Sequence, residues 1–265
     1  MKKLLFLTTI FLAMLGSVAF ISCTKDDDDN NENTEKPETQ TDPAVKEGYC
    51  PDANHPHLIN LGKGMLWCCC NVDAKQPSDF GGFYAWGELE EKDNYDITTY
   101  IYSDRKDEQS CWELDQMFES RYIPFTDHTY SISATPLDVA YVKMGKQWMM
   151  PNDTDAELLI DNCKFQVTKL NGVDGCKMTG PSGKSIFLPA GGVKVRKGHY
   201  TELSWGLKGE EGISSWGLYL VGTRYADWAK WDCEGFAIDT REGIYIESWD
   251  RVAGRMVRPI KNSIN

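Results

Sequence analysis

The chain has few basic residues for its length. Its 265 residues include 28 Lys and Arg against 40 Asp and Glu, a formal net charge of -12. An acidic chain repels phosphate, so we expect no nucleic-acid partner. There is no Gly-x-x-x-x-Gly-Lys loop, and the four histidines form no Ser-His-Asp or Cys-His pattern. These absences favour a protein that is not an enzyme.

Long hydrophobic runs are also scarce, with one exception near the start. Lys2 and Lys3 precede a stretch from Leu4 to Ile21 that is apolar apart from two Thr, one Gly and one Ser. A basic start, an apolar core and a small residue are typical of an export signal, which we predict for residues 1–22. The alternative is a membrane-spanning anchor, because the stretch is about long enough to cross a bilayer.

The end of this segment resembles the lipobox of bacterial lipoproteins. It reads Phe20-Ile21-Ser22-Cys23, with Phe where Leu is usual. The resemblance implies that Cys23 becomes the mature N-terminus and carries lipid, and two or more acyl chains hold a protein stably at a bilayer. Residues 24–29 resemble the Lys-acidic sorting signal of surface lipoproteins in Bacteroides-type bacteria. We therefore expect a lipid-anchored outer-membrane protein exposed at the cell surface.

Residues 23–44 have the composition of a disordered acidic tether. They contain eight Asp or Glu residues, two Lys and a single Ala among other polar residues and Pro. Such a segment cannot bury enough apolar surface to offset the cost of ordering the chain. Like-charge repulsion extends it, which would lift a domain away from the lipid headgroups. Residues 45–265 are left to form one folded domain.

The remaining sequence predicts a β-rich domain. Short alternating runs lie between glycine-containing turns, and Asn171-Gly172 is a strong hairpin signal. The expected strands are 59–61, 65–72, 83–86, 164–170, 176–179, 185–188, 235–239, 244–249 and 255–260.

Two helices are expected among these strands. The first runs from Pro136 to Met144, with Thr135 as its cap and Pro at its first position. The second begins near Asn152 or Asp153 and ends around Asn162, with acidic residues in its first turn. A few helices among many short strands indicate the α+β class.

A set of short segments runs in order along residues 57–260. The segments are 61–67, 70–72, Phe83-Tyr84-Ala85-Trp86-Gly87-Glu88, Trp148-Met149-Met150-Pro151, 157–163, 171–175, 180–183, 186–190 and 254–259. Together they resemble one family, the Fibrobacter succinogenes major paralogous domain. The resemblance implies a C-type-lectin-like fold related to formylglycine-generating enzymes, with two helices, a small antiparallel sheet and long irregular loops that can carry a binding site. Members are typically exported lipoproteins.

Aromatic and acidic residues near the C-terminus are the candidate ligand-binding residues. A flat indole can stack on the apolar face of a sugar ring, and carboxylates can accept hydrogen bonds from its hydroxyls. The alternative is that these aromatics are core and edge-strand residues. Because they match family motifs, Trp86, Trp148 and Trp216 are expected in the core. The expected ligand-binding residues are Tyr225, Trp228, Trp231, Asp232, Trp249 and Asp250.

The sequence predicts no metal or other cofactor. Lectins of this fold bind calcium through Glu-Pro-Asn or Gln-Pro-Asp together with Trp-Asn-Asp, and the nearest segments, 76–79 and 151–153, do not match. Zinc is the rival, with ligands from Cys50, His55, His57 and the cysteines 68–70. Zinc sites usually contain short Cys-x-x-Cys or His-x-x-x-His steps, which are missing here, so we give this site little weight.

Eight cysteines remain when Cys23 is lipidated, and an even number in an exported chain favours disulfides. Adjacent strand residues point to opposite faces, so Cys68 and Cys70 should share a face and Cys69 should take the other. The family motifs suggest that Cys70 pairs with Cys163.

We therefore expect a surface-anchored lipoprotein that binds a glycan or an extracellular protein. A diversity-generating-retroelement target protein with variable loops is a related possibility. One alternative is a cysteine-dependent enzyme related to formylglycine-generating enzymes, which would need an exposed thiol of low pKa. The other is a structural envelope or fimbria-associated lipoprotein whose aromatics form a protein interface.

Overall fold

The computed structural model describes residues 41–103, 131–195, 216–224 and 232–263. The chain divides into two units, Met1–Thr39 and Gln40–Asn265, and every described residue belongs to the second. Within the described ranges, no helix has both the length and the apolar composition needed to cross a membrane. The predicted lipidation residue Cys23 lies outside these ranges.

Three small antiparallel sheets and three helices make up the described part, which is α+β with more strand than helix. The sheets have the strand orders β1-β2-β10-β3, β4-β5-β6 and β7-β8-β9. In chain order the elements are α1 (Pro43–Lys46), β1 (Leu58–Gly62), β2 (Met65–Cys68), α2 (Val139–Lys143), β3 (Trp148–Met149), α3 (Asp153–Asn162), β4 (Lys164–Leu170), β5 (Val173–Thr179), β6 (Ser185–Pro189), β7 (Trp216–Arg224), β8 (Asp232–Asp239), β9 (Gly243–Asp250) and β10 (Ile260–Lys261).

The β4-β5-β6 meander confirms the hairpin prediction. Asn171 and Gly172 both have positive φ angles, 53° and 81°, as a type I′ turn requires, and they join β4 to β5 in register. A second turn at residues 180–184 leads from β5 into β6. The local turn chemistry therefore fixes this sheet.

Helix α3 also begins and ends as predicted. The side chain of Asn152 accepts a hydrogen bond from the backbone of Asp155, and the Asp155 carboxylate accepts one from the backbone of Asn152, which completes a capping box.

Helix α2 begins later than the sequence predicts. Its N-cap is Asp138, whose buried carboxylate accepts backbone hydrogen bonds from Ala140 and Tyr141. Thr135, the predicted cap, instead donates to the carbonyl of Ile132. The carboxylate also accepts hydrogen bonds from the backbone N–H groups of Ala134 and Met150. One side chain therefore stabilises both the start of α2 and the end of β3.

Several predicted strands are shorter or longer than expected. Residues 83–86 form only an isolated bridge between Tyr84 and Arg255, and β2 ends at Cys68 instead of residue 72. The predicted strand 255–260 is reduced to β10 and isolated bridges. Strand β7 was not predicted, because its nine residues are nearly all buried and do not alternate.

The described part of the chain begins with α1, which includes Pro43 and Ala44 at the end of the predicted tether. Asp42 caps this helix through its side chain, and Ala44 is fully buried. The segment that follows the acidic stretch is therefore packed onto the domain from residue 42 onwards.

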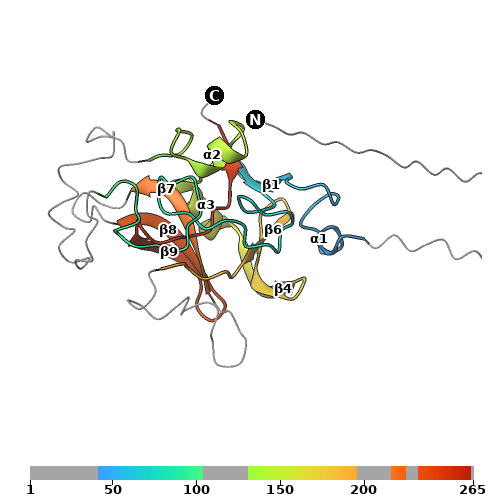
Figure 1. Cartoon of the computed structure of the whole chain (residues 1–265). Coiled ribbons are helices and arrows are strands. Elements are labelled where there is room, and N and C mark those ends of the chain that lie inside the picture. The colour runs from blue at the N-terminus through green and yellow to red at the C-terminus, as the bar shows by residue number, and fades with distance from the viewer. Residues whose placement is uncertain (1–40, 104–130, 196–215, 225–231, 264–265) are drawn as a thin grey trace, which may run out of the picture. The chain divides into compact units, whose positions relative to one another are not determined.

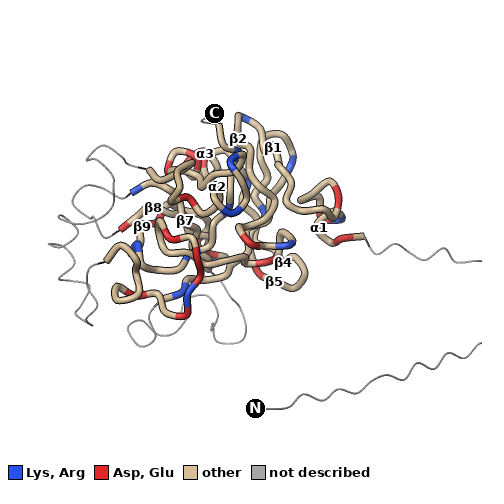
Figure 2. The backbone as a smooth tube through the Cα atoms, turned by 45° about the horizontal axis from the view of Figure 1, so that its top comes forward, with Lys and Arg blue, Asp and Glu red and all other residues tan. Residues whose placement is uncertain are grey.

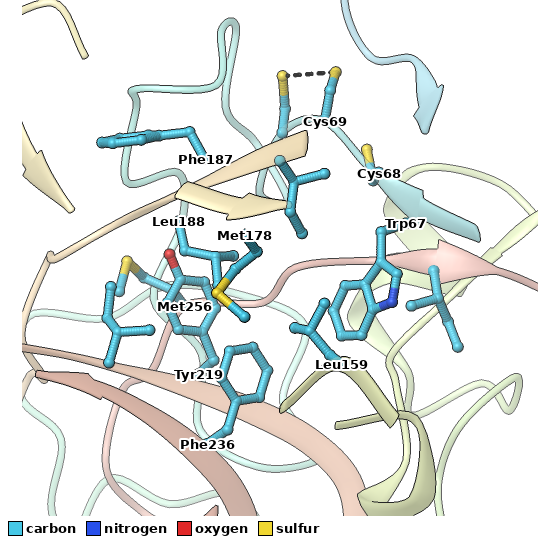
Figure 3. Close-up of a cluster of buried hydrophobic side chains, with 14 of the residues drawn as sticks. Trp67, Cys68, Cys69, Leu159, Met178, Phe187, Leu188, Tyr219, Phe236 and Met256 are labelled. Atoms are coloured by element: carbon cyan, nitrogen blue, oxygen red, sulfur yellow. Dashed lines mark hydrogen bonds between the residues drawn. The ribbon is translucent and has the colours of Figure 1, made fainter. Parts of the chain in front are cut away.

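The main core fills the space between the sheets (Figure 3). The rings of Tyr219 and Phe236 stack with centroids 4.8 Å apart, and Trp67 meets Phe236 edge to face. Trp86, Trp148 and Trp216 are buried, which confirms their prediction as core residues. In Figure 1 the β7-β8-β9 sheet occupies one end of the domain, while β4, β6 and α1 lie toward the other.

Candidate functional site

The predicted carboxylates Asp232 and Asp250 lie opposite each other at the end of the β7-β8-β9 sheet. They are the last register pair of β8 and β9, so both side chains project from the same face. Tyr225, Trp228 and Trp231 lie outside the described residues. They belong to the connection between β7 and β8, whose two ends are Arg224 and Asp232.

Burial and mutual repulsion perturb these two carboxyls. Burial, followed by the nearby charge of Asp250, raises the pKa of Asp232 to about 6. Burial also raises the pKa of Asp250, which accepts a hydrogen bond from Asp232. Because the pKa of both carboxyls is raised, the pair retains a proton up to mildly acidic pH.

Two buried arginines lie close to the carboxylate pair. The Nε of Arg251 donates to the backbone carbonyl of Asp232 at 3.1 Å, and its guanidinium lies 4.7 Å from the centroid of the Trp86 ring. Arg255 donates to the thiol sulfur of Cys233. Figure 2 shows acidic and basic residues scattered along the described backbone. Both guanidinium groups are buried, so they offset part of the negative charge of Asp232 without offering donors at the surface.

Trp249 does not join the carboxylates. It lies next to Asp250 on β9, and neighbouring strand residues point to opposite faces. Trp249 packs instead against Trp216, with ring centroids 5.9 Å apart, beside a small cluster that includes Val193 and Ala253. The sequence treats Trp249 and Asp250 as one patch, and the strand geometry separates them.

The raised pKa of Asp232 predicts a pH-dependent stability. Between the unfolded value of 3.8 and about 6 the folded state binds more protons, so the free energy of unfolding falls as pH rises through this window. Asp232→Asn keeps a hydrogen-bond donor toward Asp250 and removes the titration. We expect it to raise the free energy of unfolding at pH 7 by about 1–2 kcal/mol and to flatten the profile between pH 4 and 6.

Urea unfolding of the purified chain at several pH values measures this effect. Asp161→Asn, at an exposed position near the end of α3, serves as the control and should leave the profile unchanged. If the free energy of unfolding of Asp232→Asn fell as steeply with pH as that of the parent, the raised pKa of Asp232 would be contradicted.

The seven described cysteines form no disulfide. The predicted pair of Cys70 and Cys163 is not joined. The predicted alternation of Cys68, Cys69 and Cys70 is also wrong, because β2 ends at Cys68 and the chain then bends. This bend brings the sulfurs of Cys69 and Cys70 to within 3.3 Å (Figure 3, dashed line).

A second group of side chains converges at the same end of β1 and β2. Cys50, His55, His57 and Cys69 each offer one donor atom, and the four atoms lie within 4.8 Å of one another. The sequence argument gives this group little weight because it contains no short Cys-x-x-Cys step. The sequence signal for this group is the presence of Cys50, His55 and His57 within eight residues, followed by the β1-β2 hairpin with Cys69 directly after it.

A hollow of about 440 Å³ lies elsewhere, between the β1-β2 turn, α3 and the residues after β10. Its lining includes Met65, Asp155, Leu158 and Ile260. None of the predicted ligand-binding residues lines it, so it adds nothing to the site at the end of the β7-β8-β9 sheet.

Comparison with known proteins gives no relative for this chain. No family model matches it, and neither does any curated protein or solved structure. What the protein does is therefore inferred from its own residues.

Proposed function

We propose that the protein is a lipoprotein anchored in the outer membrane through Cys23, which displays a C-type-lectin-like domain at the cell surface and binds a glycan there. The observation that carries the binding site is the carboxylate pair of Asp232 and Asp250 at the end of the β7-β8-β9 sheet. The pair adjoins one end of the segment 225–231, where the sequence places Tyr225, Trp228 and Trp231.

The chemistry of this sheet end suits a ligand rich in hydroxyl groups. A carboxylate accepts hydrogen bonds, whereas a protonated carboxyl donates one, so a hydroxyl can be held as donor and acceptor at once. Asp232 and Asp250 are only partly buried, which leaves them accessible. The adjoining aromatics would supply the flat surface on which a sugar ring stacks.

Two alternatives receive less support. A cysteine-dependent enzyme needs an accessible thiolate, and six of the seven described cysteines are buried. An envelope protein without a small ligand would leave the partly buried carboxylate pair without a role, although partial burial of two adjacent carboxyls raises the pKa of both and destabilises the fold at neutral pH.

The test is a glycan array probed with the full chain purified in detergent. We expect binding, and we expect the Asp232→Asn, Asp250→Asn double variant to weaken it at least tenfold, which corresponds to about 1.4 kcal/mol. Trp228→Ala with Trp231→Ala should weaken it about 30-fold, since tryptophans at binding sites commonly contribute 2 kcal/mol or more.

Trp249→Ala is the matched control, because Trp249 packs on the other face of the sheet. It should change the affinity less than twofold. Asp232→Asn is expected to stabilise the fold, so weaker binding by that variant would not reflect unfolding. The proposal fails if no glycan binds while crosslinking on intact cells captures a protein neighbour at this end of the sheet.

A further inference from the structure

Four metal-binding side chains meet where the N-terminal part of the domain joins the β1-β2 hairpin. Cys50 follows α1, His55 and His57 precede β1, and Cys69 directly follows β2. Their two sulfur and two nitrogen donors all lie within 4.8 Å of one another. The four residues come from three segments of the chain. The first and last of them, Cys50 and Cys69, are 19 positions apart in the sequence.

Both imidazoles are oriented by carboxylates. The Nε2 of His55 lies 3.1 Å from the Asp42 carboxylate, and the Nε2 of His57 lies 3.2 Å from the Asp52 carboxylate. With Nε2 protonated and held in this way, Nδ1 is the unprotonated nitrogen of each ring, and that of His55 faces the sulfur of Cys69. Carboxylate–imidazole pairs of this kind orient histidines that ligate metals.

The Nδ1 atom of His57 supplies an independent indication. It is buried and has no hydrogen-bond partner. A buried polar nitrogen without a partner is costly, and such atoms are rare in folded proteins. Coordination of a metal ion at this lone pair would satisfy it.

The spacing is close to that of a tetrahedral site. The Nδ1 of His55 lies 3.6 Å from the sulfur of Cys69, and zinc–sulfur and zinc–nitrogen bonds of normal length at tetrahedral angles place such atoms about 3.6 Å apart. All four donor atoms lie within 4.8 Å of one another. Side-chain movements of about 1 Å would bring them to the spacing of a tetrahedral zinc site.

We propose that Cys50, His55, His57 and Cys69 bind a structural zinc ion. Two thiolates and two imidazoles are a donor set that selects zinc in tetrahedral sites. Four protein ligands leave no open position for a substrate, which is typical of structural zinc. On binding, the two thiols release their protons to solvent and the ion takes up both sulfur lone pairs.

The ion would fix the start of the domain. It would join the segment that contains Cys50 and His55 to the end of β2, close to the cap of α1 at Asp42. The zinc site would therefore stabilise the first described segment of the domain, residues 42–57, against the β1-β2 hairpin. Buried residues hold the β2 end in place as well, since Arg258 donates to the carbonyls of Cys68 and Cys69.

Oxidation to a disulfide competes with zinc binding at these thiols. The sulfur of Cys69 also lies 3.3 Å from that of Cys70, and Cys50 is a neighbour of Cys69. Zinc and a disulfide that uses Cys69 exclude each other. The oxidation state of Cys69 in the mature protein is therefore part of the test.

The experiment measures zinc in the full chain purified in detergent with thiols protected from oxidation. We expect about one zinc per chain, and we expect His57→Ala to lower the affinity for added Zn²⁺ at least 100-fold. Asp52→Asn changes only the exposed carboxylate that orients the His57 ring. It should weaken zinc binding about tenfold and leave the fold intact. Removal of zinc by a chelator should lower the thermal midpoint of the parent and leave that of His57→Ala unchanged.

Cys163→Ser and Asp161→Asn are the matched controls, because both residues lie outside the group, and each should retain full zinc binding. Two results would overturn the proposal. One is a zinc content that His57→Ala does not reduce. The other is peptide mapping that finds Cys69 in a disulfide in a mature protein that contains no zinc. Neither result bears on the glycan site, which lies at the end of a different sheet.

Discussion

Replacing Arg258 with Met should lower the free energy of unfolding by about 4–6 kcal/mol, the largest effect we expect from any single substitution in the described part of the chain. Arg258 is fully buried, and its guanidinium donates four hydrogen bonds. The acceptors are the side-chain oxygen of Asn71 and the backbone carbonyls of Cys68, Cys69 and Phe187.

The size of the effect follows from what the substitution leaves behind. Each buried carbonyl without a donor costs about 1–3 kcal/mol, and Met supplies no donor. Cys68, Cys69 and Asn71 lie at or just after the end of β2, and Phe187 lies in β6. Arg258 therefore links the segment before β10 to both of these strands. The loss is comparable to the total stability of a typical domain, about 5–15 kcal/mol.

Urea unfolding followed by tryptophan fluorescence measures the loss. Arg241→Met is the matched control, because the Arg241 side chain is 77 % exposed, and it should change stability by less than about 0.5 kcal/mol. Arg258→Lys should lie between the two, since an ammonium group cannot reproduce the planar fork. An Arg258→Met chain that loses less than about 1 kcal/mol would show that water replaces the guanidinium.

Local signals account for the parts of the fold that the sequence predicts well. The Asn-Gly turn sets the register of β4 and β5, and the capping box sets the start of α3. Both depend on residues within a few positions of each other. Strand β7 and the cap of α2 depend on distant partners, because β7 is covered on both faces and Asp138 must reach the backbone of Met150. A sequence pattern does not contain those contacts.

The same distinction applies to the candidate sites. Asp232 and Asp250, both expected as ligand-binding residues, meet as the last register pair of β8 and β9, a pairing that the predicted strands 235–239 and 244–249 stop short of. The sequence does not separate Trp249 from them, because it treats residues that are close in the chain as one surface. The sequence names Cys50, His55 and His57 with the cysteines 68–70 as a zinc alternative but gives them little weight, because the four ligands converge only when the segment before β1 folds back onto the end of β2.

Replacing Cys23 with Ser should release the protein from the membrane. Cys23 lies outside the described residues, and the prediction comes from the lipobox-like sequence that ends at this residue. Serine has no thiol to accept a diacylglyceryl group, so the chain would carry no lipid. A single acyl chain binds a bilayer only reversibly, with an association constant of about 10⁴ M⁻¹, so removal of all lipid should shift the protein from the membrane pellet to the soluble fraction almost completely.

Labelling with a radioactive fatty acid and fractionation of cells measure this outcome. The parent should be labelled and sediment with the outer membrane, and Cys23→Ser should do neither. Cys163→Ser is the control and should behave as the parent, because Cys163 caps the end of α3 within the domain. A Cys23→Ser protein that still sediments with membranes would indicate that residues 4–21 remain as a spanning anchor.

The orientation of the anchored protein is tested in the same cells. If residues 24–29 direct export to the outer face, protease added to intact cells should remove the domain of the parent. Exchange of Asp26, Asp27, Asp28 and Asp29 for Ala should protect it, because the lipoprotein would then stay on the inner face. The described segment that starts at residue 42 should resist cleavage, since Asp42 caps α1 and its carboxylate contacts His55. We therefore expect the protease to cut the N-terminal part of the chain within the acidic stretch, ahead of residue 42.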